Sequence, residues 1–343
     1  MNYDKPLIIY THGSGRLGNQ LFSYAHLVAF LSEYSNRYNF INFGFIPYSK
    51  LLKNTSENLC CIYPTEHKPF VPLTYLAPII EAKLSSRLTS YFQEKLTVNT
   101  IRLIHAYGSI SPQCQSLIVN DIYHWSFITG KRVQYLDLAL PETADYFSNK
   151  IFTALAGWSI RSWSLLEKHK HCVREALAFH PRYIDIAQSF IDNLRQEYDF
   201  LIGVAVRQGD YRSSGEIFKR FLFEVDQYVN WIQQAKDVFA HKGRIGFVLT
   251  ADEPQDPEKF TGMSVHFSTG IAGGKGHFVE SLIELSLCDM VMASGTTFAA
   301  WSAFAGNIPF LPLHKLNQKI LAEDTLSYFE ALKLFDTLGN KIL

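Results

Sequence analysis

An arginine and an aspartate stand where a buried strand is expected to end. Residues 200–206 read Phe-Leu-Ile-Gly-Val-Ala-Val, without the alternation of a half-exposed strand, which is typical of a parallel sheet covered on both faces. Arg207 and Asp210 follow, in the region where open α/β sheets bind ligands. A guanidinium there can hold a phosphate through paired charge-assisted hydrogen bonds, a planar geometry that lysine lacks. The alternative is an Arg207–Asp210 ion pair that only shapes a turn.

A second expected strand, within residues 247–251, leads into Asp252. This carboxylate is suited to grip a base or a ribose hydroxyl. It is equally suited to cap the short helix that Pro254 and the acids after it indicate.

A third strand, ending near residue 293, leads into a Ser-Gly-Thr-Thr-Phe segment and then a helix. Hydroxyls and free amides at such a helix start suit a diphosphate. A plain N-cap at Thr296 or Thr297 would explain the segment without a ligand. The candidate donor-binding residues here are Ser294, Gly295, Thr296, Thr297 and Phe298.

A glycine-spaced loop follows the apolar run at residues 7–10, and we expect the next helix to begin near Asn19. Gly13, Gly15 and Gly18 of this loop match the pattern G-x-G-x-x-G. A dinucleotide-binding fold also requires an acid at the end of the next strand, about 20 residues on, and none is present there. A phosphate-binding P-loop is excluded because no Lys-Ser or Lys-Thr pair follows the glycines. An anion site at the helix start and a tight turn without a ligand both remain open.

Length and charge limit the class of protein. A chain of 343 residues exceeds the usual single domain, and 47% hydrophobic residues indicate a fully globular protein. The 32 Lys and Arg balance the 32 Asp and Glu, so no overall field favours nucleic acid. Five cysteines without C-x-x-C spacing predict neither a disulfide framework nor a zinc site. No signal peptide or membrane span is recognisable, so we expect a cytoplasmic protein.

The elements that must position these residues divide into two expected domains. Helical spacing over residues 161–178 and 182–197 leads to the buried strand at residue 200, so we place the boundary just before it. The predicted domains are residues 1–197 and 198–343. Near the second set of strands, Gly273 and Gly274 suggest a flexible lip whose Lys275 reaches a ligand's phosphates, or else an exposed surface loop.

Taken together, these motifs resemble the bacterial α-1,2-fucosyltransferases and, more widely, the α-1,6- and protein O-fucosyltransferases. The resemblance is carried by residues 15–22 (Gly-Arg-Leu-Gly-Asn-Gln-Leu-Phe), residues 204–211 (Val-Ala-Val-Arg-Gln-Gly-Asp-Tyr) and the Ser-Gly-Thr-Thr-Phe-Ala-Ala-Trp segment. It implies a GT-B fold, with two Rossmann-like domains facing across a cleft. It also implies an inverting, metal-independent transfer of fucose from GDP-fucose to a glycan, with no cofactor.

The family resemblance assigns roles to matching positions. It implies that Arg207 binds the β-phosphate of the donor. It also implies that the glycine loop contacts the donor through Gly15, Arg16, Gly18 and Asn19. It also brings the segment after residue 293 to the diphosphate and Asp252 to the nucleotide pocket. The acceptor is an oligosaccharide or a lipid-linked glycan, so a peripheral contact with the inner face of the membrane is compatible with the resemblance.

The chemistry of the residues agrees with this assignment. A leaving diphosphate gathers negative charge, which Arg207 and the amides of residues 295–297 can stabilise. No Asp-x-Asp occurs, so we expect this charge to be neutralised by protein rather than by Mg²⁺ or Mn²⁺. Glu216 is the first candidate for the general base and Asp210 the second, and each has a structural role as its alternative.

Two positions depart from the family pattern His-x-Arg-Arg-x-Asp. Ala205 replaces the histidine and Gln208 replaces the second arginine. The departures leave two alternatives open, a GT-B transferase with a different nucleotide sugar and a non-catalytic glycan-binding descendant.

Overall fold

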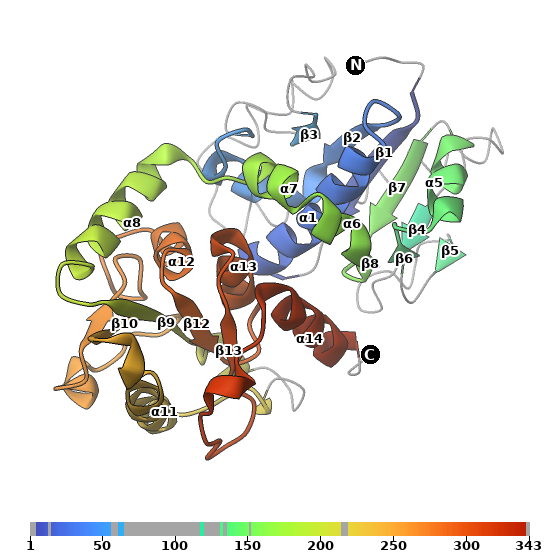
Figure 1. Cartoon of the computed structure of the whole chain (residues 1–343). Helices are drawn as coiled ribbons and strands as arrows, with labels where there is room; N and C mark the ends of the chain where they lie inside the picture. The colour runs from blue at the N-terminus through green and yellow to red at the C-terminus, as the bar shows by residue number, and fades with distance from the viewer. Residues whose placement is uncertain are drawn as a thin grey trace. The chain divides into compact units, whose positions relative to one another are not determined.

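The chain divides into unit 1, Met1–His180, and unit 2, Pro181–Leu343 (Figure 1). The computed structural model describes residues 5–12, 15–55, 61–64, 117–119, 131–132, 136–150, 152–213 and 219–340. The division falls before helix α8 (Pro181–Leu194), whereas the predicted boundary follows it. The reason is packing, because Ile191 and Leu194 of α8 share an apolar cluster with Leu201 and Val248 of unit 2.

The sheet of unit 1, within the described residues, has six strands in the order β3-β2-β1-β7-β4-β5. Neighbouring strands run parallel, except that β3 is antiparallel to β2. A separate parallel pair joins β6 to β8. The strands are β1 (Leu7–His12), β2 (Asn39–Asn42), β3 (Ile62–Tyr63), β4 (Leu117–Val119), β5 (Lys131–Arg132), β6 (Leu136–Asp137), β7 (Phe152–Ala156) and β8 (Ile160–Arg161).

Helix α1 (Leu17–Glu33) is buried along most of its length. Its sequence carries one formally charged residue, Glu33, and its polar side chains Gln20, Ser23 and His26 are buried together with the apolar ones. Glu33, the last residue of the helix, contacts Lys168 at 2.7 Å and His169 at 2.6 Å. The other helices of unit 1 are the 3-10 helix Phe43–Leu51, α5 (Pro141–Ser148), α6 (Trp163–Lys168) and α7 (Lys170–Ala176).

The sheet of unit 2 is parallel throughout, in the order β11-β10-β9-β12-β13. Numbered along the chain, this is the order 3-2-1-4-5 of a Rossmann sheet, with its switch point between β9 and β12. The strands are β9 (Phe200–Val206), β10 (Ile245–Ala251), β11 (Val265–Phe267), β12 (Met290–Ala293) and β13 (Phe310–Pro312).

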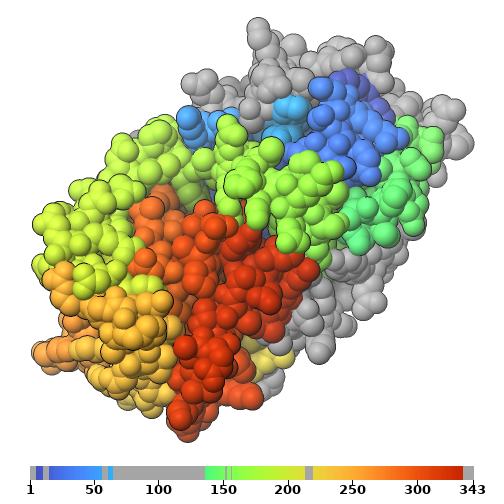
Figure 2. All heavy atoms as spheres, viewed as in Figure 1, coloured from blue at the N-terminus to red at the C-terminus, as the bar shows by residue number. Residues whose placement is uncertain are grey.

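Both faces of this sheet are covered, which explains the unbroken apolar run of β9. Ile202, Val204 and Val206 face a cluster with Trp231 of α11 (Val225–Val238), whereas Ala205 faces α12 and α13. On the second face α8 packs beside α12, and Figure 2 shows their lime and orange surfaces side by side. The remaining helices of unit 2 are α9 (Gly209–Ser213), α12 (Phe278–Ser286), α13 (Thr297–Gly306), α14 (Tyr328–Asn340) and the 3-10 helices Ala240–Lys242, Pro257–Phe260 and Ala322–Asp324.

The structure thus confirms the predicted α/β class, with a Rossmann-like sheet in each unit that is parallel throughout in unit 2 and parallel except for β3 in unit 1. The strand expected at residues 200–206 has those bounds. The helix expected from Asn19 begins earlier, at Leu17.

Candidate functional site

Arg207 and Asp252 meet because their strands are neighbours in register. β9 ends at Val206 and β10 at Ala251, and these two residues are paired across the parallel ladder. The residue after each strand therefore emerges at the same edge of the sheet. This edge is the carboxyl edge, where ligands of doubly wound sheets bind.

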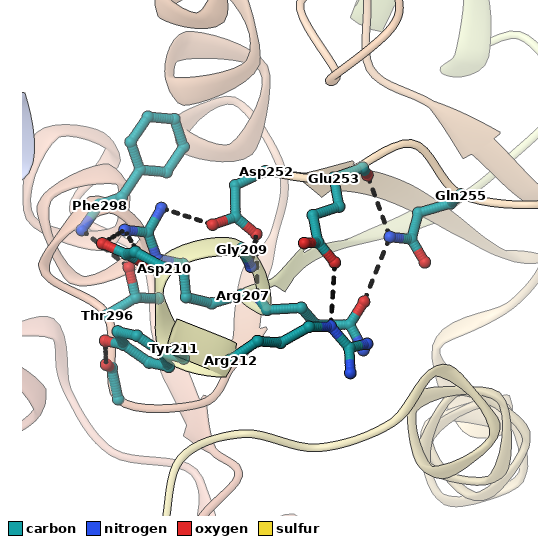
Figure 3. Close-up of polar contacts among 12 residues, drawn as sticks. Arg207, Gly209, Asp210, Tyr211, Arg212, Asp252, Glu253, Gln255, Thr296 and Phe298 are labelled. Atoms are coloured by element: carbon teal, nitrogen blue, oxygen red, sulfur yellow. Dashed lines mark hydrogen bonds and ion pairs between the residues drawn. The ribbon is translucent and has the colours of Figure 1, made fainter. Parts of the chain in front are cut away.

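The guanidinium of Arg207 lies between two carboxylates (Figure 3). Its Nη1 lies 2.8 Å from Asp252 Oδ2, and its Nη2 lies 2.7 Å from Asp210 Oδ1. The side chains of Arg207 and Asp252 are 20% and 16% exposed, against 36% for Asp210. The three side chains together carry a formal charge of minus one, so the cation is fully compensated within the cluster.

Asp252 also organises the turn after β9. Its Oδ1 accepts hydrogen bonds from the backbone N–H of Gln208, at 2.8 Å, and of Gly209, at 3.2 Å. A Cβ on Gly209 would lie 2.8 Å from Asp252 Oδ2, so only glycine permits this approach. The capping alternative for Asp252 is therefore wrong for the helix after Pro254. That short helix is capped by Asp256, which accepts from the backbone N–H of Glu258 at 3.0 Å.

The two candidates for the general base differ in what the structure says of them. Asp210 lies in the first turn of α9 and makes an ion pair with Arg207. This is the ion pair that was expected as the alternative to ligand binding. Glu216 lies outside the described residues.

The segment after β12 is largely satisfied by its own chain. Thr296 is the N-cap of α13, and its hydroxyl accepts from the backbone N–H of Phe298 at 3.3 Å, so the capping alternative holds there. Thr297 is the first residue of the helix. Ser294 is completely buried, and its hydroxyl lies 3.2 Å from that of Tyr228. Its side chain is therefore part of the interior in this structure.

Tyr211 joins the turn that follows β9, which contains Arg207, to the segment after β12. The sequence did not reveal this role. The hydroxyl of Tyr211 donates to the carbonyl of Gly295 at 2.6 Å, and its ring centre lies 5.3 Å from the guanidinium carbon of Arg207. Burial raises the pKa of Tyr211 to about 12, so the hydroxyl keeps its proton at neutral pH. Gly295 has its own constraint, because a Cβ there would lie 2.8 Å from the ring of Phe221.

The two departures from the family pattern occupy packed positions. Gln208 is 1% exposed, and its Nε2 donates to the carbonyl of Phe223 at 2.8 Å. Ala205 lies in the cluster under α13, with Ala293 and Ala299. Neither side chain adds charge to the carboxyl edge. Beyond them, Arg212 makes an exposed ion-pair network with Glu224 and Glu253 that the sequence also did not reveal.

The glycine loop belongs to unit 1. Gly15 has φ +80°, and the Asn19 side chain fills the space where a Cβ on Gly15 would lie. Arg16 is exposed and is the N-cap of α1, but its side chain makes no capping hydrogen bond. Instead, the hydroxyl of Tyr48 makes a hydrogen bond with the backbone of Leu17, although burial is the larger influence and raises the pKa of this phenol. Gly18 is buried inside the helix start.

Within the described ranges, no three His, Cys, Asp or Glu side chains are grouped to hold a metal ion. No described helix has the length and apolar composition that crossing a membrane requires.

No protein-family model matches the chain, and no match is found among curated proteins. Among solved structures, POFUT1 in complex with GDP is similar at a TM-score of 0.47 and 11% identity, covering 90% of this chain and 96% of that chain. POFUT1 in complex with GDP-fucose has a TM-score of 0.45 at 10% identity, with 90% and 96% covered. A mutant of Arabidopsis thaliana FUT1 in complex with GDP has a TM-score of 0.46 at 11% identity, with 90% and 70% covered.

Proposed function

We propose that this chain is a GT-B glycosyltransferase that moves fucose from GDP-fucose to a hydroxyl of a glycan, in an α-1,2 linkage. The observation that carries the proposal is the place of Arg207, at the switch point of the unit 2 sheet and joined through Tyr211 to the start of α13. The sequence motifs at residues 15–22 and 204–211 support the same donor.

The switch point favours a nucleotide because chain connections leave it in opposite directions. β9 lies between β10 and β12, and the crevice outside such strand ends is where nucleotides bind in doubly wound sheets. The N-terminus of α13 adds backbone N–H groups and a partial positive charge to the cation of Arg207. A diphosphate is the anion that suits both.

In the proposed reaction, the acceptor hydroxyl oxygen attacks C1 of fucose and the bond from C1 to the β-phosphate oxygen breaks. The configuration at C1 inverts, GDP leaves with the bonding electron pair, and the hydroxyl proton passes to a base. Arg207 stabilises the charge that grows on the diphosphate, and no metal ion takes part. Glu216 is the first candidate for the base because it follows the arginine turn in sequence.

Donor binding in this proposal requires an exchange of partners at Arg207. Asp252 is the more buried carboxylate and is also held by backbone N–H groups, so it keeps the guanidinium in place. Asp210 is more exposed and gives up Nη2 to the diphosphate. Asp252 is then a positioning residue, and Asp210 is a stand-in for the anion.

A calorimetric titration with GDP and GDP-fucose, with and without EDTA, tests the proposal. We expect binding that is indifferent to EDTA and that weakens about a hundredfold, or about 2.7 kcal/mol, in Arg207→Ala. Arg207→Lys retains the charge but should lose most of the affinity, because it lacks the planar fork. Arg244→Lys is the matched control, since Arg244 makes an exposed ion pair with Asp199 in the same unit. Absence of GDP binding, or equal binding by the Arg207 variants, contradicts the proposal.

A transferase with another nucleotide sugar is the second candidate. It is favoured by Ala205, which packs among apolar side chains, and by Gln208, which donates to a buried carbonyl, because neither adds charge where the family pattern has a histidine and an arginine. A thermal-shift panel of GDP-, UDP- and CMP-sugars separates the two. Stabilisation by a UDP- or CMP-sugar alone would replace fucose transfer with this candidate.

The proposed acceptor is an oligosaccharide or a lipid-linked glycan in a bacterial cytoplasm. The glycine loop of unit 1 is assigned to the donor by the motif alone. Asn19→Ala tests this role separately, because loss of donor affinity is then expected without any change at Arg207.

A further inference from the structure

Thr269, in the loop between β11 and α12, contacts two buried glutamates of α12. The Thr269 hydroxyl oxygen lies 2.9 Å from Glu280 Oε2 and 2.5 Å from Glu284 Oε1. The backbone N–H of Thr269 donates to Glu284 Oε2 at 3.1 Å. Glu280 and Glu284 are four residues apart on α12, which places them on one face, and they are 5% and 0% exposed.

The number of protons in this cluster can be counted. A threonine hydroxyl has one proton to donate, yet its oxygen is in hydrogen-bond contact with two carboxyl groups. If both glutamates were ionised, two adjacent carboxylates would have to share this single proton. A proton on one carboxyl removes that conflict, and Glu284 is the better candidate because it has the shorter contact and the deeper burial.

No cation near Glu284 takes the place of this proton among the described elements that pack around α12. β9, β10, β12 and α13, which pack around α12, contain no ionisable side chain. The pKa of His277 is lowered mainly by burial and further by the charge of Arg182 on α8. The pKa of the Cys288 thiol is raised by burial. Among the described residues no ion pair joins Glu284 to a basic group. Burial raises the pKa of Glu284 to about 7, against the hydrogen bonds from Thr269, which lower it, and with a smaller contribution from the charge of Glu280.

The same cluster holds the loop between β11 and α12, residues 269–277, in place. The backbone N–H of Gly276 donates to the carbonyl of Thr269 at 3.0 Å, and a Cβ on Gly276 would collide with the Glu280 carboxylate. At the other side of the loop, the N–H of Ala272 donates to the carbonyl of Ala251 at 3.2 Å, directly before Asp252. The loop is thus fixed between α12 and the strand end that holds Asp252.

We infer that Glu284 is held as a neutral carboxylic acid and that its proton clamps loop 269–277 onto α12, so that loss of the proton releases the loop. The folded chain favours the protonated form, so the clamp's contribution to stability is complete below the ordinary glutamate pKa of 4.5 and is lost as the pH rises through about 7. The glycines at positions 273 and 274 then permit motion that the clamp controls.

Hydrogen exchange of the backbone amides in loop 269–277 tests this inference without any ligand. After correction for the intrinsic rate, we expect opening to be about tenfold more frequent near pH 8.5 than near pH 5.5. Glu284→Gln replaces the acid with an amide that can still donate, so its loop should stay protected at both pH values. Glu323→Gln, in an exposed position of unit 2, is the matched control and should respond as the unmodified protein does.

A second measurement needs no variant. Carbon-13 NMR titration of the glutamate carboxyls in the unmodified protein should show one group with a midpoint near 7. The inference is overturned if every glutamate titrates near its ordinary value, if loop exchange is independent of pH, or if Glu284→Gln keeps the full pH response.

The effect on donor binding rests on the proposed function. If GDP binds beside Asp252, its affinity should fall at alkaline pH in the unmodified protein and not in Glu284→Gln. Failure of GDP to bind at any pH would contradict the proposed function, whereas the exchange experiment alone decides on the clamp.

Discussion

Helices α1 and α13 each begin near a strand end, yet their first turns are stabilised in different ways. Before α13, Thr296 supplies a local cap, and Tyr211 holds the carbonyl of Gly295. At α1, Arg16 supplies no side-chain cap, and the hydroxyl of Tyr48, far along the chain, bonds to the backbone of Leu17.

The surroundings of the two helix starts differ more than the helices themselves. Next to α13 lies a cluster of three charged side chains in which a more exposed carboxylate occupies one side of an arginine. Around the described part of the glycine loop, Asn19 packs against Gly15 and the start of the helix is buried. The edge of unit 2 therefore holds a carboxylate that an anion can replace, whereas the packing at the start of α1 holds the backbone of the glycine loop in the conformation that is proposed to meet the donor.

The largest effect that we expect in this comparison is on stability, from Asp252→Ala. The change leaves the N–H groups of Gln208 and Gly209 without their acceptor and removes one partner of Arg207. Urea unfolding should show a loss of about 2–4 kcal/mol. Asp252→Asn keeps an acceptor oxygen and should lose less. Equal losses would mean that charge, rather than backbone capping, is what Asp252 contributes.

Asp210→Asn should produce the next effect, and in the opposite direction. Removing the charge that competes for Arg207 should tighten GDP binding about tenfold, or about 1.4 kcal/mol, by calorimetry. If the affinity is unchanged while transfer is abolished, Asp210 acts as the base and does not stand in for the anion.

The smallest effect is expected in unit 1, from Tyr48→Phe. This change removes the hydroxyl that bonds to the start of α1, and should cost about 0.5–1.5 kcal/mol of unfolding free energy. GDP affinity should fall much less than in Arg207→Ala, because Tyr48 holds the glycine loop and has no proposed contact with the donor. A loss of affinity as large as that of Arg207→Ala would remove the contrast between the units.

Local patterns in the sequence predicted the framework of unit 2 well. The apolar run of β9 is unbroken because Ile202 and Ala205 face helices on opposite sides of the sheet, and such runs can be recognised directly. The cap of α13 was also foreseen as an alternative, since Thr296 and the N–H it accepts are neighbours in sequence.

Contacts between distant residues were not predicted from the sequence. Asp252 caps α9 rather than the helix that follows it, because β9 and β10 are in register. Tyr48 and Thr269 are not part of any motif recognised in the sequence, and only the fold brings them to α1 and α12. The boundary before α8 depended in the same way on packing against β9 and β10.

A crystal structure of the protein soaked with GDP tests the central claim most directly. The account predicts a diphosphate within hydrogen-bond distance of the Arg207 guanidinium and the first turn of α13, with Asp210 displaced and Asp252 still bound to Arg207. A nucleotide bound elsewhere, or an Arg207–Asp210 pair that is unchanged when GDP is present, would contradict it.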